Sequence, residues 1–439
     1  MSRAASLALA GALLVSACGD GSGNVDWRAQ IGPNPPLPEA KQYLFPPFNV
    51  APVVGWKGDE TPTAPAGFRV QALARDLSNP RNVLALPNGD VLVVESKGPD
   101  LEPALRPKDI IMGWAMAKAH GDSGPKRPTN QITLLRDANG DGVAESRIVL
   151  VPHLNSPFGI AYADGALYVG DTDAILRIPY TPGQTRTAGP ATVLTSLPGG
   201  PIDHHWTKDL TLSPDGARIY VGIGSNSNIT ENGMEAEKGR AAIWEVDRRT
   251  GAAREYATGL RNPNGLTFYP GTNSLWAVIN ERDELGPNLV PDYMTYVRPG
   301  GFYGWPYSYY GQHVDPRVRP QRPDLVARAI PPDYALSSHV AALGLTFYTG
   351  DNLPPAYRGG AFVGEHGSWD RDHFNGYKVV FVPFANGRPN GKAQDFLTGF
   401  LSNDGKARGR PVGVTTDRTG ALLVADDAGN SVWRVTRAG

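Results

Sequence analysis

The sequence repeats one two-strand pattern six times. Each copy has a turn of small residues or Asn and Pro, an apolar strand, a turn rich in Asp, Asn and Gly, and a second apolar strand. The copies start near residues 79, 156, 209, 262, 342 and 411. A hairpin that recurs in this way is typical of a β-propeller, in which each copy begins one blade. We therefore predict an all-β, six-bladed β-propeller.

Successive copies lie about 50 to 80 residues apart, which is more than a minimal four-stranded blade needs. Several blades must therefore carry long loops. If the topology repeats, those loops gather on one face, where a functional site would be built. A pair of irregular β-sandwiches is the alternative, but it gives no reason for six copies of one hairpin.

The N-terminus has the pattern of an export signal. Arg3 precedes the apolar run ALALAGALLV, which is too short to span a bilayer and ends in the small-residue stretch VSAC. Cys18, the only cysteine, stands where bacterial lipoprotein signals place the residue that is acylated. Residues 1–18 thus predict a lipid-anchored protein in the periplasm or on the cell surface. The alternative is an ordinary signal peptide whose removal takes Cys18 with it.

Composition limits the possible partners. Residues 19–65 are rich in Gly, Pro, Asn and Asp, which predicts an extended tether, and residues 66–439 form the predicted propeller. The chain has 42 basic and 43 acidic residues and a formal net charge of -1. No overall field attracts nucleic acid or an anionic membrane, so we expect membrane contact only through the lipid anchor.

Polar side chains precede the first strand in three of the copies. Arg261, Asn262 and Asn264 lie in GLRNPNGLTFYP, and in a propeller they would point into the mouth of the central channel. Gly265 would let a ligand approach the backbone closely. His205, beside His204, occupies the equivalent position one copy earlier.

Arg408 and Arg410, in ARGRPVGV, occupy that position in the last copy. Taken singly, each of these residues has an ordinary structural role as a turn cap, a strand-edge histidine or a solvated basic loop. Their shared position in the repeat favours a common site instead.

The motifs HHWTKDLTLSPDG, GLRNPNGL, NERDELG, GGFYGWP, VGEHGSW and GRPVGV give the chain a family resemblance. From Gly67 to Arg437 it resembles the soluble sugar dehydrogenases that depend on pyrroloquinoline quinone (PQQ), most closely the sorbosone dehydrogenase branch. The resemblance implies a six-bladed propeller that holds PQQ and a calcium ion at the channel mouth. It also implies a sugar or sugar-derived aldehyde as substrate. The electrons would pass to an acceptor that the resemblance does not identify.

The resemblance assigns roles to particular residues. His205 matches the general base, because it lies five residues before Leu210, and His204 is then structural. Arg261 and Asn262 match a pair that contacts the quinone oxygens. A histidine near its ordinary pKa suits removal of a hydroxyl proton, and the Arg261 cation would stabilise developing negative charge.

Further roles concern the cofactor. Arg408 and Arg410 match a pair that binds the PQQ carboxylates, which planar guanidinium groups suit by charge and geometry. Asn264 stands where the glucose dehydrogenases have a glutamine, and Ser225 where they have an aspartate. Their cofactor-binding lysine has no clear match, and His366 is the residue expected in its place. These departures put glucose in doubt as the substrate.

Two calcium sites are predicted. By resemblance, INERDELG binds the calcium beside the quinone, largely through main-chain carbonyls, with Glu281, Arg282 and Asp283 as candidates. There the ion would act as a Lewis acid. Separately, the spacing of four residues in RDANGDGVAE resembles a calcium-binding EF-hand loop: Asp137, Asn139, Asp141 and Glu145. Ile148 replaces the usual bidentate glutamate, so a plain Asx-rich turn is an equal alternative.

Two other functions fit a six-bladed propeller. A calcium-dependent lactonase would hold a central metal with side-chain carboxylates and amides, and would give Arg408 and Arg410 no anion to bind. A non-catalytic binding propeller on the cell surface would need no cofactor. The aromatic residues of GGFYGWPYSYYG could line a sugar site, but packing between blades is the expected role for most of them.

Overall fold

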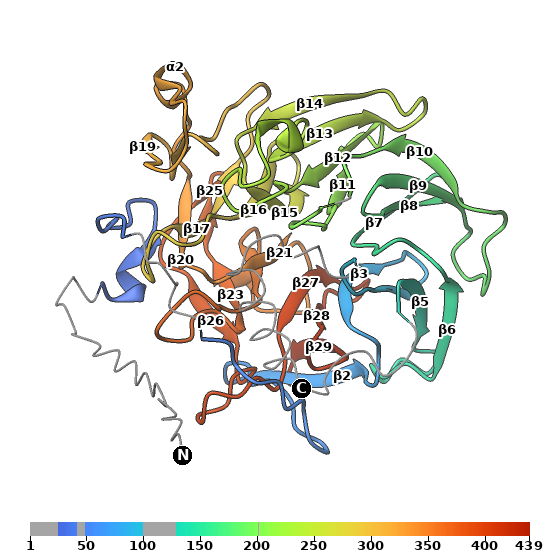
Figure 1. The fold of residues 1–439 in the computed structure, drawn as a ribbon. Helices are drawn as coiled ribbons and strands as arrows, with labels where there is room; N and C mark the ends of the chain where they lie inside the picture. The colour runs from blue at the N-terminus through green and yellow to red at the C-terminus, as the bar shows by residue number, and fades with distance from the viewer. Residues whose placement is uncertain (1–24, 42–48, 100–128, 201) are drawn as a thin grey trace, which may run out of the picture.

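The computed structural model describes residues 25–41, 49–99, 129–200 and 202–439. The predicted signal peptide and Cys18 lie outside these residues. Six antiparallel sheets of four or five strands are arranged around a central axis (Figure 1). The fold is a six-bladed β-propeller that is nearly all β, as the repeated hairpin predicts.

The first three blades are continuous in sequence. Their strands are, for blade 1, β3 Pro80–Ala85, β4 Val91–Glu95, β5 Gln131–Arg136 and β6 Ser146–Val151; for blade 2, β7 Gly159–Ala163, β8 Ala166–Gly170, β9 Ala174–Pro179 and β10 Thr192–Ser196; and for blade 3, β11 Leu210–Leu212, β12 Arg218–Ile223, β13 Ala242–Asp247 and β14 Ala253–Thr258.

The other three blades include the N-terminal strands. Their strands are, for blade 4, β15 Asn262–Phe268, β16 Leu275–Asn280, β17 Pro291–Tyr296, β20 Tyr334–Ser338 and β1 Ile31–Gly32; for blade 5, β21 Ala342–Phe347, β22 Ala361–Glu365, β23 Lys378–Val382 and β26 Gln394–Leu397; and for blade 6, β27 Pro411–Thr416, β28 Leu422–Asp426, β29 Ser431–Arg437 and β2 Phe68–Ala74.

Short elements occupy the loops between these strands. They are η1 Trp27–Gln30, η3 Met234–Glu237, α2 Pro323–Val326, η4 Pro355–Tyr357, β18 Ser308–Tyr309, β19 His313–Val314, β24 Phe384–Ala385 and β25 Arg388–Pro389. Among the described residues, no helix is long and apolar enough to cross a membrane.

Each predicted hairpin is the innermost pair of strands of one blade. The inner strands β3, β7, β11, β15, β21 and β27 each contact the inner strand of the next blade, which closes the ring. The ring closes through both ends of the chain, because β2 pairs with β29 in blade 6. The carboxylate of Asp426 supports this closure by accepting hydrogen bonds from the indole N–H groups of Trp56 and Trp433, at 2.7 and 2.9 Å.

The described part of the predicted tether lies against the propeller. Strand β1 adds to the outer edge of blade 4 beside β20, and Val53 and Thr63 form bridges with Ala407 and Thr398. Apolar side chains explain these contacts, because Leu37 and Trp56 pack against buried clusters. The boundary at residue 66 stays a prediction, but residues well before it contribute to the packing.

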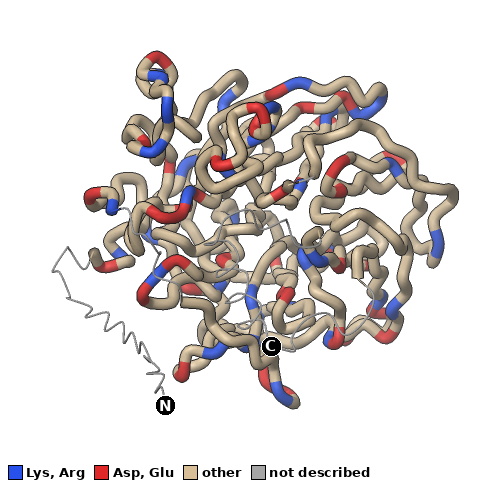
Figure 2. The backbone as a smooth tube through the Cα atoms, viewed as in Figure 1, with Lys and Arg blue, Asp and Glu red and all other residues tan. Residues whose placement is uncertain are grey.

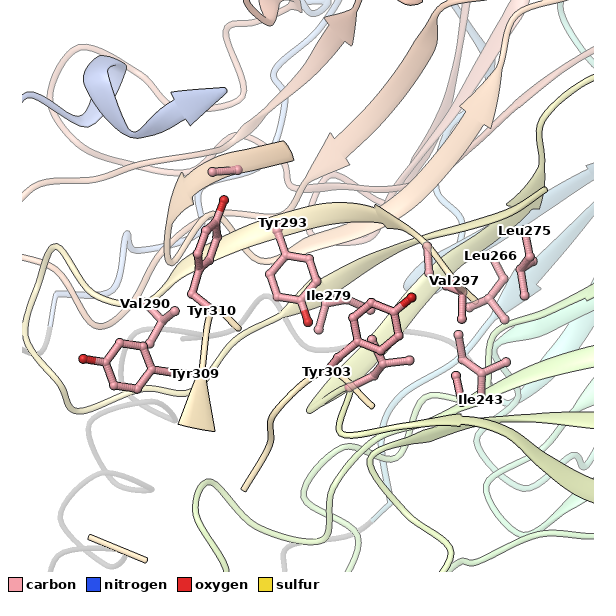
Figure 3. Close-up of a cluster of buried hydrophobic side chains, with 14 of the residues drawn as sticks. Ile243, Leu266, Leu275, Ile279, Val290, Tyr293, Val297, Tyr303, Tyr309 and Tyr310 are labelled. Atoms are coloured by element: carbon pink, nitrogen blue, oxygen red, sulfur yellow. The ribbon is translucent and has the colours of Figure 1, made fainter. Parts of the chain in front are cut away.

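The aromatic stretch after β17 is mostly packing, as expected. Tyr303, Tyr309 and Tyr310 belong to one buried cluster with Tyr293 (Figure 3). The rings of Tyr293 and Tyr310 meet edge to face, with centroids 5.9 Å apart. On the outside, basic and acidic residues are interspersed around the ring (Figure 2), which agrees with the balanced composition.

Candidate functional site

Polar residues from several blades gather at one end of the propeller axis. The inner strand of a blade starts where its second strand ends, because the two are antiparallel: Asn262 pairs with Asn280, and Pro411 with Asp426. Residues just before an inner strand therefore lie beside residues just after a second strand. We call this end of the propeller axis the mouth.

His205 is half-buried in the mouth before β11. Its Nδ1 atom lies 3.0 Å from the carbonyl oxygen and 2.9 Å from the hydroxyl oxygen of Ser225. The Ser225 hydroxyl donates its own hydrogen to the carbonyl of Ser227 at 2.6 Å. Both Ser225 oxygens must therefore accept from His205, which places the hydrogen on Nδ1 and leaves the lone pair on Nε2.

The surroundings of His205 favour its neutral form. Burial lowers the pKa of His205 well below its ordinary value, and the nearby charge of Arg261 lowers it further. Gly224 leaves room for both His205 and Asn262, since a Cβ on Gly224 would lie 2.3 Å from the His205 Cβ and 2.6 Å from the Asn262 side-chain oxygen. His204 is exposed, and its ring meets that of His205 edge to face with centroids 4.8 Å apart.

Arg261 lies in the mouth but binds protein acceptors. It is only 2% exposed. Its guanidinium donates to the Asn228 side chain at 2.9 Å, to the Glu281 carbonyl at 2.6 Å and to the Asp283 carboxylate at 2.9 Å. The cation predicted to meet the quinone is thus held rigidly beside His205.

Asp283 links Arg261 to a buried histidine. The Asp283 carboxylate lies 3.3 Å from Nδ1 of His339, whose Nε2 lies 3.2 Å from the carbonyl of Gly286. Burial alone would raise the pKa of Asp283, but Arg261 and His339 lower it to about 2. Burial would lower the pKa of His339, but the hydrogen bond to Asp283 and the charge of Asp370 raise it to about 9. His339 is therefore an imidazolium between two carboxylates.

The asparagines of the RNPNG motif have unequal positions. Asn262 begins β15 in the mouth, whereas Asn264 is fully buried and donates to the Asn262 side chain at 3.2 Å. The expectation for Gly265 is wrong. A Cβ there would lie 2.8 Å from the backbone nitrogen of Leu345, so the missing side chain serves packing between blades 4 and 5.

A second group of charged residues surrounds Asp427, which follows β28. Arg81 and His366 both contact its carboxylate, with the His366 Nε2 atom at 2.9 Å. Arg410 is buried over the Tyr377 ring, 5.4 Å from its centre. Although burial would raise it, the pKa of Asp427 lies well below its usual range because of His366 and Arg81.

This group has unused donors. Among the described residues, the buried Nε atoms of Arg81 and Arg410 have no hydrogen-bond partner. Arg81 also lies over an aromatic face, with its guanidinium carbon 5.5 Å from the centre of the Trp206 ring. Burial and the nearby Arg410 and Arg81 charges lower the pKa of His366 despite its contact with Asp427.

Arg408 lies elsewhere. Its guanidinium is 36% exposed, 3.7 Å from the Glu60 carboxylate, and donates to the Gly399 carbonyl at 3.4 Å. Of the predicted arginine pair, the structure brings only Arg410 to the Asp427 group.

The residues predicted for the quinone-associated calcium lie after β16. Glu281 Oε1 is buried without a partner, and the side chain of Arg282 pairs with buried Asp315. The main-chain carbonyls of Glu281 and Asp283 accept hydrogen bonds from Arg261 and Arg282. Ligand atoms of Asp283, His339 and Asp370 lie within 4.8 Å of one another.

The second predicted calcium site is the turn between β5 and β6. Asp137, Asp141 and Glu145 bring carboxylate oxygens within 4.8 Å of one another on the surface. Asp137 also accepts hydrogen bonds from the N–H groups of Gly140 and Gly142, and Asn139 accepts one from Asp141. The geometry suits both of the alternatives that the sequence leaves open.

Of the residues that follow the second strands, sequence reasoning named those after β16 and β22 but missed the one after β28. That residue is Asp427, and Arg81, the second residue of β3, was also missed. The signal was present in the repeats, because second strands end in GDT, GSN, NERD, GEH and ADD, which all place polar residues at the mouth.

Comparisons with known proteins agree with this architecture. A family model described as TrAA12-like matches residues 129–293 and 323–438. An uncharacterized protein of Borreliella burgdorferi is 30% identical over 292 residues, which cover 64% of this chain and 76% of that protein. The pyrroloquinoline quinone-dependent pyranose dehydrogenase of Coprinopsis cinerea is 23% identical over 438 residues, but the match covers only 54% of its length, against 84% of this chain.

A solved structure shows the same fold. The holo form of the PQQ domain of pyranose dehydrogenase from Coprinopsis cinerea has a TM-score of 0.68 at 21% identity, covering 89% of this chain and 100% of that one. The aldose sugar dehydrogenase YliI of Escherichia coli is 22% identical over 312 residues, 66% of this chain and 76% of that enzyme. With a family model that covers more than half of its residues, the chain belongs to the TrAA12-like family.

Proposed function

We propose that the protein is a PQQ-dependent oxidoreductase that oxidises a sugar or a sugar-derived aldehyde. One observation carries the proposal. His205, whose Nε2 has no hydrogen bond within the described part of the chain, shares the mouth with Arg81 and Arg410, whose buried Nε donors have no partner there either. A general base and unfilled cationic donors at one opening suit an alcohol-type substrate and an anionic ligand.

The residues present fit PQQ, a tricarboxylate quinone. Arg81, Arg410 and His366 would face its carboxylates, while Arg261 and Asn262 lie on the His205 side of the mouth. In this proposal Arg81, rather than Arg408, is the second arginine that would bind the PQQ carboxylates. When bound, PQQ supplies the quinone carbon that accepts a hydride from the substrate.

The chain's own contribution to the chemistry is proton removal. His205 Nε2 would accept the proton of the substrate hydroxyl, which for an aldehyde is a hydroxyl of its hydrate, and Ser225 holds the opposite ring nitrogen in the protonated state. The pKa of His205 lies well below the ordinary value that the sequence led us to expect, so the ring is neutral at neutral pH but is a weaker base than a free histidine. The Arg261 cation stabilises negative charge that develops nearby, with its position fixed by Asn228 and Asp283.

Oxygen donors for calcium lie around Asp283, but an ion there would have to compete with Arg261 and His339 for the Asp283 carboxylate. Carboxylate and carbonyl oxygens are the ligands that calcium prefers, and Glu281, Asp283 and Asp370 supply them. The guanidinium of Arg282 cannot bind a cation, so this residue would contribute its carbonyl. Binding through the Glu281 or Asp283 carbonyls would replace their present hydrogen bonds to arginines.

The finer assignments extend this proposal. The sorbosone-dehydrogenase motifs support a sugar-derived aldehyde as substrate, with electrons passed to an acceptor that is still to be identified. The signal and Cys18 support export and a lipid anchor in the periplasm or on the cell surface. The mass of the mature N-terminal peptide would report the acyl groups directly.

Reconstitution tests the function. The purified protein is mixed with PQQ and calcium, passed through gel filtration and examined by absorbance, and its activity is then measured with an artificial dye acceptor and a panel of aldoses and sorbosone. We expect a retained chromophore that a panel substrate reduces. Failure to retain PQQ would contradict the proposal and favour the lactonase or binding-propeller alternative.

A further inference from the structure

Glu237 is a buried carboxylate that has no part in the chemistry described so far. It ends helix η3, in the loop between β12 and β13, and is 6% exposed. One of its oxygens accepts the backbone N–H of Asn226 at 2.6 Å, and the other accepts the hydroxyl of Ser227 at 2.6 Å. A buried carboxylate is costly unless such hydrogen bonds compensate it, so its position is closely tied to residues 226 and 227.

Those two residues lead directly to His205. The Ser227 carbonyl accepts the hydroxyl hydrogen of Ser225, and Ser225 then accepts from His205 Nδ1 through two oxygens. The Asn226 carbonyl accepts the backbone N–H of His204 at 3.3 Å. Glu237 thus holds residues 225–227 in place. That segment contacts His204 and His205 through backbone and side-chain atoms.

The direction of these hydrogen bonds determines the tautomer of His205. A serine hydroxyl has one hydrogen, and here the Ser227 carbonyl takes it. The Ser225 carbonyl, 3.0 Å from Nδ1, can only accept, so the tautomer changes only if residues 225–227 shift enough that this carbonyl leaves Nδ1 and the hydroxyl turns to donate to it. The ring hydrogen would then sit on Nε2, and the lone pair would no longer face the mouth.

We infer that Glu237 is a positioning residue that keeps His205 in the Nδ1–H tautomer by fixing residues 225–227. The geometry stands on its own, whereas the catalytic consequence rests on the proposed function. Glu235 provides a matched control, because it lies two residues earlier on the same helix and is exposed.

Nitrogen NMR of the full-length protein, without added cofactor, tests the tautomer. The eight histidines are labelled with nitrogen-15, and the His205 signals are assigned from their loss in His205→Gln. We expect the parent and Glu235→Gln to show Nδ1–H with an unprotonated Nε2. Glu237→Gln should show a mixture of tautomers or a mobile ring.

Unchanged His205 signals in Glu237→Gln, or an Nε2–H tautomer in the parent, would overturn the inference. If Glu237→Gln does not fold, Ser227→Ala serves instead, because it removes one of the two hydrogen bonds to Glu237 and only one oxygen atom. The same shift toward a mixture is expected there, and its absence would equally overturn the inference.

Kinetics of the PQQ-loaded protein test the consequence. In Glu237→Gln we expect kcat for a substrate of the parent to fall about tenfold or more, with KM little changed, since a hydrogen bond to a charged group is lost. An equal loss in Glu235→Gln would overturn the role of Glu237. If the parent itself oxidises nothing, the proposed function fails, and the NMR result still decides the positioning.

Discussion

The two sides of the mouth differ in how completely their cations are satisfied. On the side of blades 3 and 4, Arg261 donates to Asn228, Asn280, Glu281 and Asp283, and none of its nitrogen atoms is left unpartnered. On the side of blades 5, 6 and 1, the buried Nε atoms of Arg81 and Arg410 have no partner. One side is organised before any ligand arrives, and the other has donors that an anion would complete.

This difference suggests that the side of blades 3 and 4 serves catalysis and that the side of blades 5, 6 and 1 serves cofactor binding. Fixed donors and a fixed tautomer lower the cost of reorganisation during proton transfer, which suits a catalytic side. Unpartnered buried donors carry a desolvation cost that a bound carboxylate would remove. Variants on the two sides should therefore fail in different ways.

The largest effect is expected from His205→Gln on the organised side. The variant should keep PQQ but slow reduction of the bound cofactor by about 10²–10⁴-fold, since it removes the general base. Single-turnover stopped flow is the appropriate measurement, because steady-state rates with an artificial acceptor can hide the chemical step.

His204→Gln is the matched control. His204 is exposed, and the hydrogen bonds to Ser225 come from His205, so replacing His204 should have a small effect. A normal reduction rate in His205→Gln, with cofactor occupancy verified, would remove His205 from the mechanism. A defect confined to His204→Gln would mean that the neighbouring histidine is the base.

A smaller effect is expected on the other side. Arg410→Ala should weaken PQQ binding about 10- to 100-fold, because a charge-assisted hydrogen bond is typically worth about 1.5–3 kcal/mol. Arg81→Ala should act in the same direction. Equilibrium titration of PQQ by absorbance measures both, and the reduction rate of the fully loaded variants should stay near that of the parent.

Arg408→Ala is the control for that side. Arg408 lies beside Glu60 and is 36% exposed, so its loss should change PQQ affinity little. The opposite result, with Arg408 important and Arg410 dispensable, would show that the loop before β27 rearranges when the cofactor binds.

The sequence predicts the fold well and the site partly. All six inner strands follow from one repeated pattern, since alternation of apolar residues and turn chemistry are local properties. His205, Arg261 and Arg410 also follow, because equal positions in a repeat become equal positions around an axis. Arg408 does not, because the chain before β27 is irregular and the two-residue period of a strand does not hold there.

Contacts between blades escaped prediction for a physical reason. Asp427 meets Arg81 across 346 residues of sequence, and His366 meets it from a third blade. Such pairs depend on how the ring closes, which no local pattern encodes. The chain Glu237, Ser227, Ser225, His205 is likewise visible only in three dimensions.

The smallest effect concerns pH and sharpens the description of the organised side. Burial and the Arg261 charge lower the pKa of His205 well below 6.5, so the protonated form is scarce at neutral pH. Between pH 6.5 and 8 the reduction rate should therefore change less than about twofold. Below the lowered pKa, the ring becomes protonated and the rate should fall about tenfold per pH unit.

Removing the nearby cation should move this profile in a known direction. In Arg261→Gln the positive charge that disfavours protonation is lost, so the pKa of His205 rises and the fall in rate begins at a higher pH. The measurement is the single-turnover rate against pH for parent and variant, each loaded with PQQ. A profile that keeps its midpoint in Arg261→Gln would mean that Arg261 does not act electrostatically on His205, and that the low pKa arises from burial and the other nearby groups, His204 and Lys208.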